Sequence, residues 1–342
     1  MQRVTQQDIA DSLQVSRITV SKALNGVEGI SRSMRKQVLT KAVELGYIKS
    51  FPENLTLPEN PQNIVIPGHK RKVISLLTYM NCSTDSYWSP VTNGMVSVLA
   101  EAGYDLSFCF LTGLDEPEFV FPKNFSKETT AGIIILGYYT KSQVEVIHSL
   151  GLPTVSVETF AEYLEHGLLT DTIMCDCSFR VKEMVSYMVE LGHEHICYIH
   201  QFDEGLTFVE RKQGYYESMQ KHGLMPCEAD IKEYADFEMF LECAKVNYTA
   251  YICSNDMAAI RLINFFKSKG VKIPADVSVC GIDDLNEARV LDLSTIRIPK
   301  MEIGFRAAEK ILWRIANPER VLEMVRLETT LVIRKTIGIA KK

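Results

Sequence analysis

The chain has 342 residues, of which 46% are hydrophobic and 23% charged, and its formal net charge is −6. This composition is typical of a globular protein long enough for two or three domains. It excludes a membrane-spanning protein, because no apolar run approaches the roughly 18 residues that a spanning helix needs. The first residues are polar and lack the apolar segment of a secretion signal, so we expect a cytoplasmic protein with no membrane partner.

Residues 1–50 read as a compact unit of three helices. The Thr-x-x-Asp pattern beginning at Thr5 predicts the start of the first helix, and Ser16 can cap the second. Asn25 and Gly26 suit a helix stop, and Ser31 can cap a third helix that continues to Leu45. Three helices in so short a segment predict a helix-turn-helix.

This first segment is basic although the chain is acidic. Residues 1–50 contain eight basic and four acidic residues, which leaves a net charge of −10 on the remainder. A basic head on an acidic body predicts that only the head meets a polyanion.

Residues 50–70 differ in character from both neighbours. The stretch "SFPENLTLPENPQNIVIPG" contains four prolines, which interrupt any long helix. We therefore expect a linker between the head and the body.

From Lys72 onward, short apolar runs alternate with helical periods. The expected strands are "VISLLTY", "YDLSFCF", "GIIILG", "PTVSVE", "HICYIH", "AYICS" and "VSVCGI", and the expected helices are 91–102, 178–191, 211–222 and 256–269. Nearly continuous apolar strands joined by helices predict parallel sheets covered on both faces. This number of repeats predicts two doubly wound α/β subdomains with a cleft at the carboxyl ends of their strands.

The nine cysteines do not indicate a special site. Their number is odd, no Cys-x-x-Cys pair is present, and several lie in apolar runs. Buried free thiols in a reducing compartment explain this pattern. We predict no metal site, no cofactor and no structural disulfide.

The chain resembles the LacI/GalR family of bacterial transcription regulators. The head carries "VTQQDIADSLQVSRITVSKALNG", and the body carries "AGIIILG", "ELGHEHICYI", "ERKQGYYESMQKHGL", "CSNDMA" and "IPADVSVCGIDDLNEARVL". The resemblance implies an all-α helix-turn-helix headpiece on a periplasmic-binding-protein-like body. It implies a sequence-specific DNA-binding regulator, a repressor, controlled by a small polar effector such as a sugar. The partners would be a palindromic double-stranded operator and a second copy of the chain.

The resemblance assigns the DNA contacts to the second helix. Arg17 and Ile18 would read bases, because an arginine can fork onto guanine and an isoleucine can contact a thymine methyl group. The remaining positions implied for phosphates or nearby bases are Thr5, Ser16, Thr19, Ser21, Lys22 and Asn25. Arg32 and Arg35 either add backbone contacts or form a solvated face.

The linker departs from the family pattern. Members usually have a hinge helix with an Ala-Arg-x-Leu pattern whose leucine wedges into the minor groove, but no arginine occurs here. Leu55 and Leu57 are the candidate wedges, although Pro58 limits any helix to about one turn. Whether a hinge helix forms stays open at this point.

The resemblance also places residues in an effector cleft. Arg211 would grip ligand oxygens, Asp283 would accept ligand donors, and Asn255 would add a further polar group. "TDSYWSPV" replaces the usual Asn-Pro-Phe-Phe pattern, so Tyr87 and Trp88 are stacking candidates unless one packs in the core, and Asp85 is a further candidate. Asp256, Asp284 and His193 fit structural roles, and a surface ion pair is the alternative for Arg211.

These expectations divide the chain into three segments and favour one function over three alternatives. No catalytic motif is present, which argues against an enzyme, and the basic head argues against a pure solute-binding protein. A sensor with weak DNA binding that acts through a protein partner is the remaining alternative. The expected segments are the head, 1–49; the linker, 50–70; and the body, 71–340, with one subdomain at 71–160 and 298–322, the other at 161–296 and 325–340, and crossovers near 158–162, 293–299 and 322–326.

Overall fold

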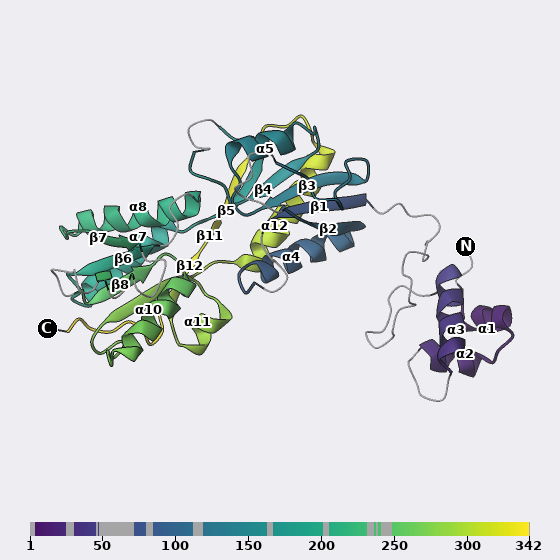
Figure 1. Ribbon diagram of the computed structural model, residues 1–342, viewed down its shortest axis with the longest axis horizontal. Helices are drawn as coiled ribbons and strands as arrows, with labels where there is room; N and C mark the ends of the chain where they lie inside the picture. The colour runs from purple at the N-terminus through teal and green to yellow at the C-terminus, as the bar shows by residue number, and fades with distance from the viewer. Residues whose placement is uncertain are drawn as a thin grey trace. The chain divides into compact units, whose positions relative to one another are not determined.

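The computed structural model describes residues 4–24, 31–45, 47, 72–79, 85–111, 119–162, 167–200, 205–230, 236, 239–240 and 248–341. The chain divides into two compact units, Met1–Lys70 and Arg71–Lys342 (Figure 1). The candidate positions Asn25, Leu55 and Leu57 lie outside the described residues.

The first unit contains α1 (Gln6–Leu13), α2 (Arg17–Leu24) and α3 (Arg32–Glu44). Thr5 and Asp8 form a reciprocal capping box at the start of α1. Gln14 ends that helix in the left-handed region at φ 51°, which turns the chain into α2. Ser16 caps α2 by accepting the Thr19 N–H at 3.0 Å, and Ser31 caps α3 by accepting the Met34 N–H at 3.2 Å. The three N-terminal caps expected from the sequence are therefore present, and the stop expected at Asn25 and Gly26 lies outside the described residues.

A small core joins the three helices. Its members are fully buried and come from all three helices: Ile9, Ala10, Val20, Ala23, Val38 and Ala42. The adjacent pair on α1 and the spacings of three residues on α2 and four on α3 each direct one helix face inward and leave the opposite face to solvent. The unit is thus a helix-turn-helix with a free outer side on α2.

The second unit contains two six-stranded sheets. The first has the strand order β11-β5-β4-β3-β1-β2 and the second the order β12-β10-β9-β8-β6-β7. Among the described residues, every strand pair is parallel except β10 with β12. The strands are β1 (Lys72–Thr78), β2 (Tyr104–Phe110), β3 (Thr130–Leu136), β4 (Thr154–Val157), β5 (Asp171–Asp176), β6 (Ile196–His200), β7 (Cys227–Asp230), β8 (Ala250–Cys253), β9 (Ser278–Asp283), β10 (Ser294–Arg297), β11 (Met324–Glu328) and β12 (Thr330–Val332).

Helices cover both faces of each sheet, as the apolar strands predicted. On β3, Ile134 and Leu136 face α4 and α12, whereas Ile133 and Ile135 pack with α5 on the opposite face. The second sheet packs α7 and α8 on one face and α10 on the other (Figure 1). The helices are α4 (Trp88–Glu101), α5 (Lys141–His148), α7 (Ser178–Glu190), α8 (Leu206–Lys221), α10 (Asp256–Ser268), α11 (Asn286–Val290) and α12 (Lys300–Ala316).

Two of the expected crossovers between the sheets are misplaced. The chain does not leave the first sheet near 158–162, because β5 at Asp171–Asp176 still pairs with β4. The chain passes from the first sheet to the second after Asp176 and returns to the first between β10 and α12. It passes to the second sheet again at Thr329, between β11 and β12. The expectation was wrong because β5 begins and ends with aspartate and does not read as an apolar run. Asp171 is nevertheless buried, where it pairs with Arg314 at 2.6 Å.

Candidate functional site

The outer face of α2 presents three of the residues expected to contact DNA. The side chain of Ile18 is 68% exposed, and Arg17 and Lys22 are also exposed. Ile18 thus places an apolar side chain between the cations Arg17 and Lys22 on one exposed face of α2. The face therefore combines phosphate-binding charge with an apolar group that can reach a base edge.

The neighbouring hydroxyl groups hold the helix ends in place. The Thr5 side chain caps α1, and the Ser16 hydroxyl lies 2.8 Å from that of Thr19 at the start of α2. Thr19 and Ser21 are half-buried. These groups position the helix relative to its turn, and their role toward DNA stays a prediction.

Arg211 is the central charged group of the body. It lies on α8 and is 3% exposed, with its guanidinium 4.8 Å from the centre of the Phe208 ring. Nη1 donates to the Ser254 carbonyl at 2.7 Å, and Nη2 lies 3.8 Å from Asp283 Oδ1. Among the described residues, Nε has no hydrogen-bond partner. A buried guanidinium with an unused donor favours an additional oxygen ligand.

Asp283 lies at the carboxyl end of β9, next to this guanidinium. Its φ of 133° is in the left-handed half of the map, which a non-glycine residue adopts rarely. Burial raises the pKa of its carboxyl group to about 7, and the charge of Arg211 opposes this rise. Lys300, at the start of α12, donates to the Asp283 main-chain carbonyl. The strained residue is thus held from two sides.

Glu158 is a second buried carboxyl group that the sequence reasoning missed. It follows β4 of the first sheet, with φ 70°, and accepts a hydrogen bond from the Thr207 hydroxyl of α8 at 3.0 Å. Burial raises its pKa to about 7, and the charge of Arg211 lowers it. The Tyr138 hydroxyl, after β3, lies 3.1 Å from the same Thr207 hydroxyl. The signal was available, because Glu158 directly follows the run "PTVSV", just as Asp283 ends its own strand.

Tyr87 joins this group, whereas three other candidates have different surroundings. Burial is the main cause that raises the pKa of Tyr87, and the charges of Glu158 and Asp283 add to it. Lys300 Nζ lies 5.7 Å from the centre of the Tyr87 ring. Its ring packs edge-on against Trp88, with 4.7 Å between the ring centres.

Trp88 itself is 8% exposed and belongs to the core of the first sheet. The Asp85 carboxylate accepts the N–H groups of Tyr87 and Trp88 at 2.8 and 3.0 Å, at the start of α4. The Asn255 side chain accepts the Ala258 N–H at 2.7 Å and caps α10. Asp85 and Asn255 thus position helix ends beside the site.

The polar residues expected to be structural have structural contacts. Asp284 pairs with Arg289, Arg297 and Arg334, which lower its pKa to about 2 against the opposing effect of burial. Asp256 accepts the Leu285 N–H at 2.8 Å and the Thr295 hydroxyl at 2.6 Å. His193 is buried, and its Nδ1 lies 2.9 Å from the Thr249 hydroxyl.

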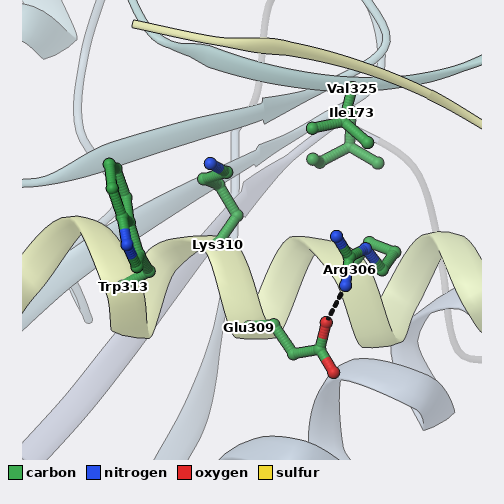
Figure 2. A pocket seen from close by; sticks show the side chains of 6 residues that line it. All are labelled: Ile173, Arg306, Glu309, Lys310, Trp313 and Val325. Atoms are coloured by element: carbon green, nitrogen blue, oxygen red, sulfur yellow. Dashed lines mark hydrogen bonds and ion pairs between the residues drawn. The ribbon is translucent and has the colours of Figure 1, made fainter. Parts of the chain in front are cut away.

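A shallow pocket lies elsewhere, between α12 and the edge of the first sheet. Figure 2 shows Lys310, Trp313 and Arg306 along one side of α12, with Ile173 and Val325 from β5 and β11 above them. Arg306 pairs with Glu309 at 2.6 Å, and Lys310 lies 4.3 Å from the Trp313 ring centre. The Arg211, Asp283 and Glu158 group is not part of its lining.

The described residues show neither a cluster suited to a metal ion nor a helix suited to span a membrane. No group of three or more potential metal-binding side chains occurs there. None of the described helices has both the length and the apolarity to span a bilayer.

Comparison with known families gives two matches. Residues 5–50 match the bacterial regulatory proteins of the lacI family, and residues 185–337 match the periplasmic binding protein-like domain. The first covers α1, α2 and α3, and the second contains Arg211 and Asp283.

Named relatives align along nearly the whole chain. The probable repressor ExuR of Bacillus subtilis is 25% identical and aligns over 98% of each chain. The ribose operon repressor of Haemophilus influenzae is 26% identical, over 97% of this chain and 98% of that protein. Both names describe transcriptional repressors rather than enzymes.

Solved structures share the fold. The regulator CelR in complex with cellobiose superposes with a TM-score of 0.64 at 20% identity, covering 98% of this chain and all of that one. The lac repressor dimer bound to operator and the anti-inducer ONPF gives 0.65 at 18% identity, with the same coverage. The head and body matches and the whole-length relatives show that the chain belongs to the LacI family of bacterial regulatory proteins.

Proposed function

We propose that this chain represses transcription by inserting α2 into the major groove of a palindromic operator, and that a neutral sugar-like effector in the body controls the binding. Arg17 and Ile18 read bases in this proposal, and Lys22 contacts phosphate. The chain acts as a homodimer on DNA in the cytoplasm.

One observation carries the proposal. The same chain has a helix-turn-helix with an exposed Arg17, Ile18 and Lys22 face, and a body with a buried Arg211 whose Nε is unpaired among the described residues. The first feature fits a polyanionic partner with readable edges, and the second fits a small ligand rich in oxygen. A DNA-binding regulator with a ligand needs both.

The chemistry around Arg211 supports a polyhydroxylated ligand. The guanidinium can donate to ligand oxygens, and the carboxyl groups of Asp283 and Glu158 can accept from hydroxyls. The ring of Tyr87 offers an apolar face of the kind that packs on a sugar. Two carboxyl groups beside one guanidinium disfavour an anionic ligand. Similar structures include the regulator CelR with cellobiose and a LacI family regulator from Enterococcus faecium with bound ribose.

The contacts between the two sheet-bearing halves of the body supply a route for control. Thr207 of the second half bonds to Glu158 of the first, and the Leu206 N–H donates to the Thr159 carbonyl at 2.8 Å. Arg326 and Glu210 form a two-point ion pair at 2.7 and 2.8 Å. A ligand that binds more tightly to one arrangement of these contacts shifts the population toward it.

The test is an operator-binding titration with the full chain. A fluorescent duplex from the region upstream of its own coding sequence is titrated at 50 and 200 mM salt, with and without each of a panel of neutral sugars, sugar acids and sugar phosphates. We expect sequence-specific binding that weakens with salt, as phosphate contacts require. A thermal-shift screen of the same panel identifies the ligand by a raised melting temperature. Binding that is equally strong to unrelated duplexes at both salts contradicts the proposal.

The alternatives from other classes lack such support. The relatives named as repressors align with the body and the head together, so neither a pure solute-binding protein nor a sensor that acts only through a protein partner is favoured.

A further inference from the structure

Two cysteines lie opposite each other at the edge of the second sheet. Cys197 on β6 and Cys227 on β7 are paired in the parallel register, and β7 is the last strand of that sheet. Their sulfur atoms are 3.9 Å apart. Adjacent strands are separated by about 4.8 Å, which falls in the Cα range that a disulfide spans. Rotation of the two side chains can therefore close the S–S bond without moving the strands.

The backbone around the pair is held firmly. The Tyr215 hydroxyl of α8 accepts the Cys227 N–H at 2.8 Å and donates to the Ile196 carbonyl, also at 2.8 Å. This bridge fixes β6 against β7, so the two sulfur atoms stay opposite each other. Both thiols are free in this structure.

The sulfur of Cys227 has the surroundings of a reactive thiol. It accepts the Tyr248 hydroxyl at 2.8 Å and the Cys197 thiol at 3.9 Å. The hydrogen bond from Cys197 is the main cause that lowers the pKa of Cys227 to about 6, and the Tyr248 hydroxyl adds to it, whereas burial and the charge of Glu228 oppose it. Cys227 is also half-buried, whereas Cys197 is fully buried and has a raised pKa because it is the donor and because of burial.

We propose that Cys227 and Cys197 form an oxidation site for hydroperoxides, with Cys227 as the attacking thiol and Cys197 as the resolving thiol. The Cys227 thiolate attacks one oxygen of hydrogen peroxide, breaks the O–O bond and becomes a sulfenic acid, while the second oxygen takes up a proton and leaves as water. The Cys197 sulfur then attacks the Cys227 sulfur, and the hydroxyl leaves with the Cys197 proton as a second water. Two thiols and one peroxide give one disulfide and two waters, and a dithiol reductant returns the disulfide to two thiols.

The experiment uses the reduced full-length protein and hydrogen peroxide. After a short exposure the protein is denatured, free thiols are alkylated, and the digest is examined by mass spectrometry without reduction. We expect a linked pair of peptides carrying Cys197 and Cys227, two hydrogens lighter than their sum, which dithiothreitol removes. Alkylation of both residues at full yield after peroxide overturns the proposal, as does linkage of either one to Cys253.

Variants separate the two roles. In Cys197→Ser, we expect Cys227 to be trapped as a sulfenic acid that dimedone labels, and in Cys227→Ser neither the linked pair nor a label on Cys197 forms. Tyr248→Phe slows formation of the linked pair several-fold, because the thiolate loses a donor. Cys175→Ser, a buried cysteine of the first sheet, is the matched control and leaves the linkage unchanged. Dimedone labelling of Cys197 instead of Cys227 in the wild-type chain contradicts the assignment.

Discussion

At the scale of single residues, the body buries two carboxyl groups within the influence of one guanidinium. Glu158 and Asp283 come from different sheets, and Arg211 comes from a helix between them in the chain. Burial raises the pKa of both acids to about 7. Such groups are poorly solvated without a partner, and a ligand that donates hydroxyls to them recovers part of that loss.

The raised pKa of Glu158 gives a prediction about pH. An acid whose pKa is raised on folding favours the folded state at low pH, and this contribution is lost as the pH rises from about 4.5 through 7. Glu158→Gln removes the charge and should therefore gain stability relative to the wild type at pH 8, by up to about 3 kcal/mol, and not at pH 4.5. Chemical denaturation at the two pH values measures the difference. Glu162→Gln, at an exposed position, is the control. An equal effect of Glu158→Gln at both pH values would show that the carboxyl stays ionised.

The guanidinium of Arg211 gives a second prediction at this scale. Arg211→Ala should abolish the rise in melting temperature caused by the effector and the effector's influence on operator binding, while binding without effector persists. The control is Lys212→Ala, at the next position in the chain, which removes an ion pair with Glu228. This variant should leave both responses to the effector intact. Effector binding measured calorimetrically in Arg211→Ala at wild-type affinity would move the site elsewhere.

On the head, substitutions of Arg17 and of Lys22 should impair DNA binding in different ways. Arg17→Ala should reduce discrimination between the operator and a single-base variant by about 1–3 kcal/mol, because a base contact is lost. Lys22→Ala should weaken binding to all duplexes alike and lower the slope of affinity against salt, as expected of a phosphate contact. Competition titrations with matched duplexes distinguish the two. Unchanged discrimination in Arg17→Ala would exclude it from base reading.

The sequence predicted part of the candidate site, for a physical reason. Arg211 and Asp283 were found because they lie in recognisable segments, although α8 begins at Leu206, five residues before the expected start, while Asp283 ends its strand as expected. Tyr138 and Thr207 were missed because only tertiary contact brings them to Glu158, and neither stands out within its own segment. Asn255 and Asp85 have side chains suited to a ligand or to a helix cap, and residue type alone does not separate the two uses.

At the scale of elements, α4 and α12 approach closely through two glycines. A Cβ on Gly304 would lie 1.9 Å from the Val91 carbonyl oxygen, and one on Gly94 would lie 2.4 Å from the Met301 carbonyl oxygen. Because both obstacles are backbone atoms, side-chain rotation cannot relieve the contact. The helices must separate to accept any larger residue.

Gly304→Ala should therefore destabilise the body by about 1–3 kcal/mol or more, as overpacking does. Gly132→Ala is the matched control, since the atoms nearest its new Cβ are side-chain atoms, Cδ1 and Cγ1 of Ile311 at 2.9 Å and Cδ1 of Ile315 at 3.3 Å, which can shift where backbone cannot. Urea unfolding of the two variants gives the comparison. A Gly304→Ala variant as stable as Gly132→Ala would show that the helices separate at little cost.

The apolar pattern predicted the continuously apolar strands and four helices of the body, but it did not predict α5, α11 or the 17-residue α12. The expected helix at 256–269 is α10, and the expected strand "VSVCGI" is most of β9. Strands β5, β7, β10, β11 and β12 were not expected. β11 and β12 alternate apolar and polar or half-buried positions at sheet edges, and β5 is framed by acids, so none presents a continuous apolar run. Their places are fixed by pairing with distant segments, which local sequence does not encode.

At the scale of the whole molecule, we expect a homodimer, because a helix-turn-helix that reads a palindrome needs two copies. Sedimentation or light scattering at micromolar concentration should give twice the mass of the 38.7 kDa chain. We expect the contact between the two copies to begin near residues 87–103, and Val96→Glu tests this, since Val96 is 43% exposed on α4. We expect this variant to be monomeric, and Glu101→Gln to remain dimeric. A wild-type mass of one chain would contradict the dimer.

The passages between the two sheets are very short. Only Cys177 separates β5 from α7, only Thr329 separates β11 from β12, and two residues separate β10 from α12. The Thr329 hydroxyl donates to the Asp176 carbonyl at 2.8 Å, which ties two of these passages side by side. With so little slack, one half cannot slide along the other and can only pivot about a common axis. A rearrangement of the body that a ligand favours is thus a rotation of one half relative to the other. The displacement of an atom in this rotation grows with its distance from the axis.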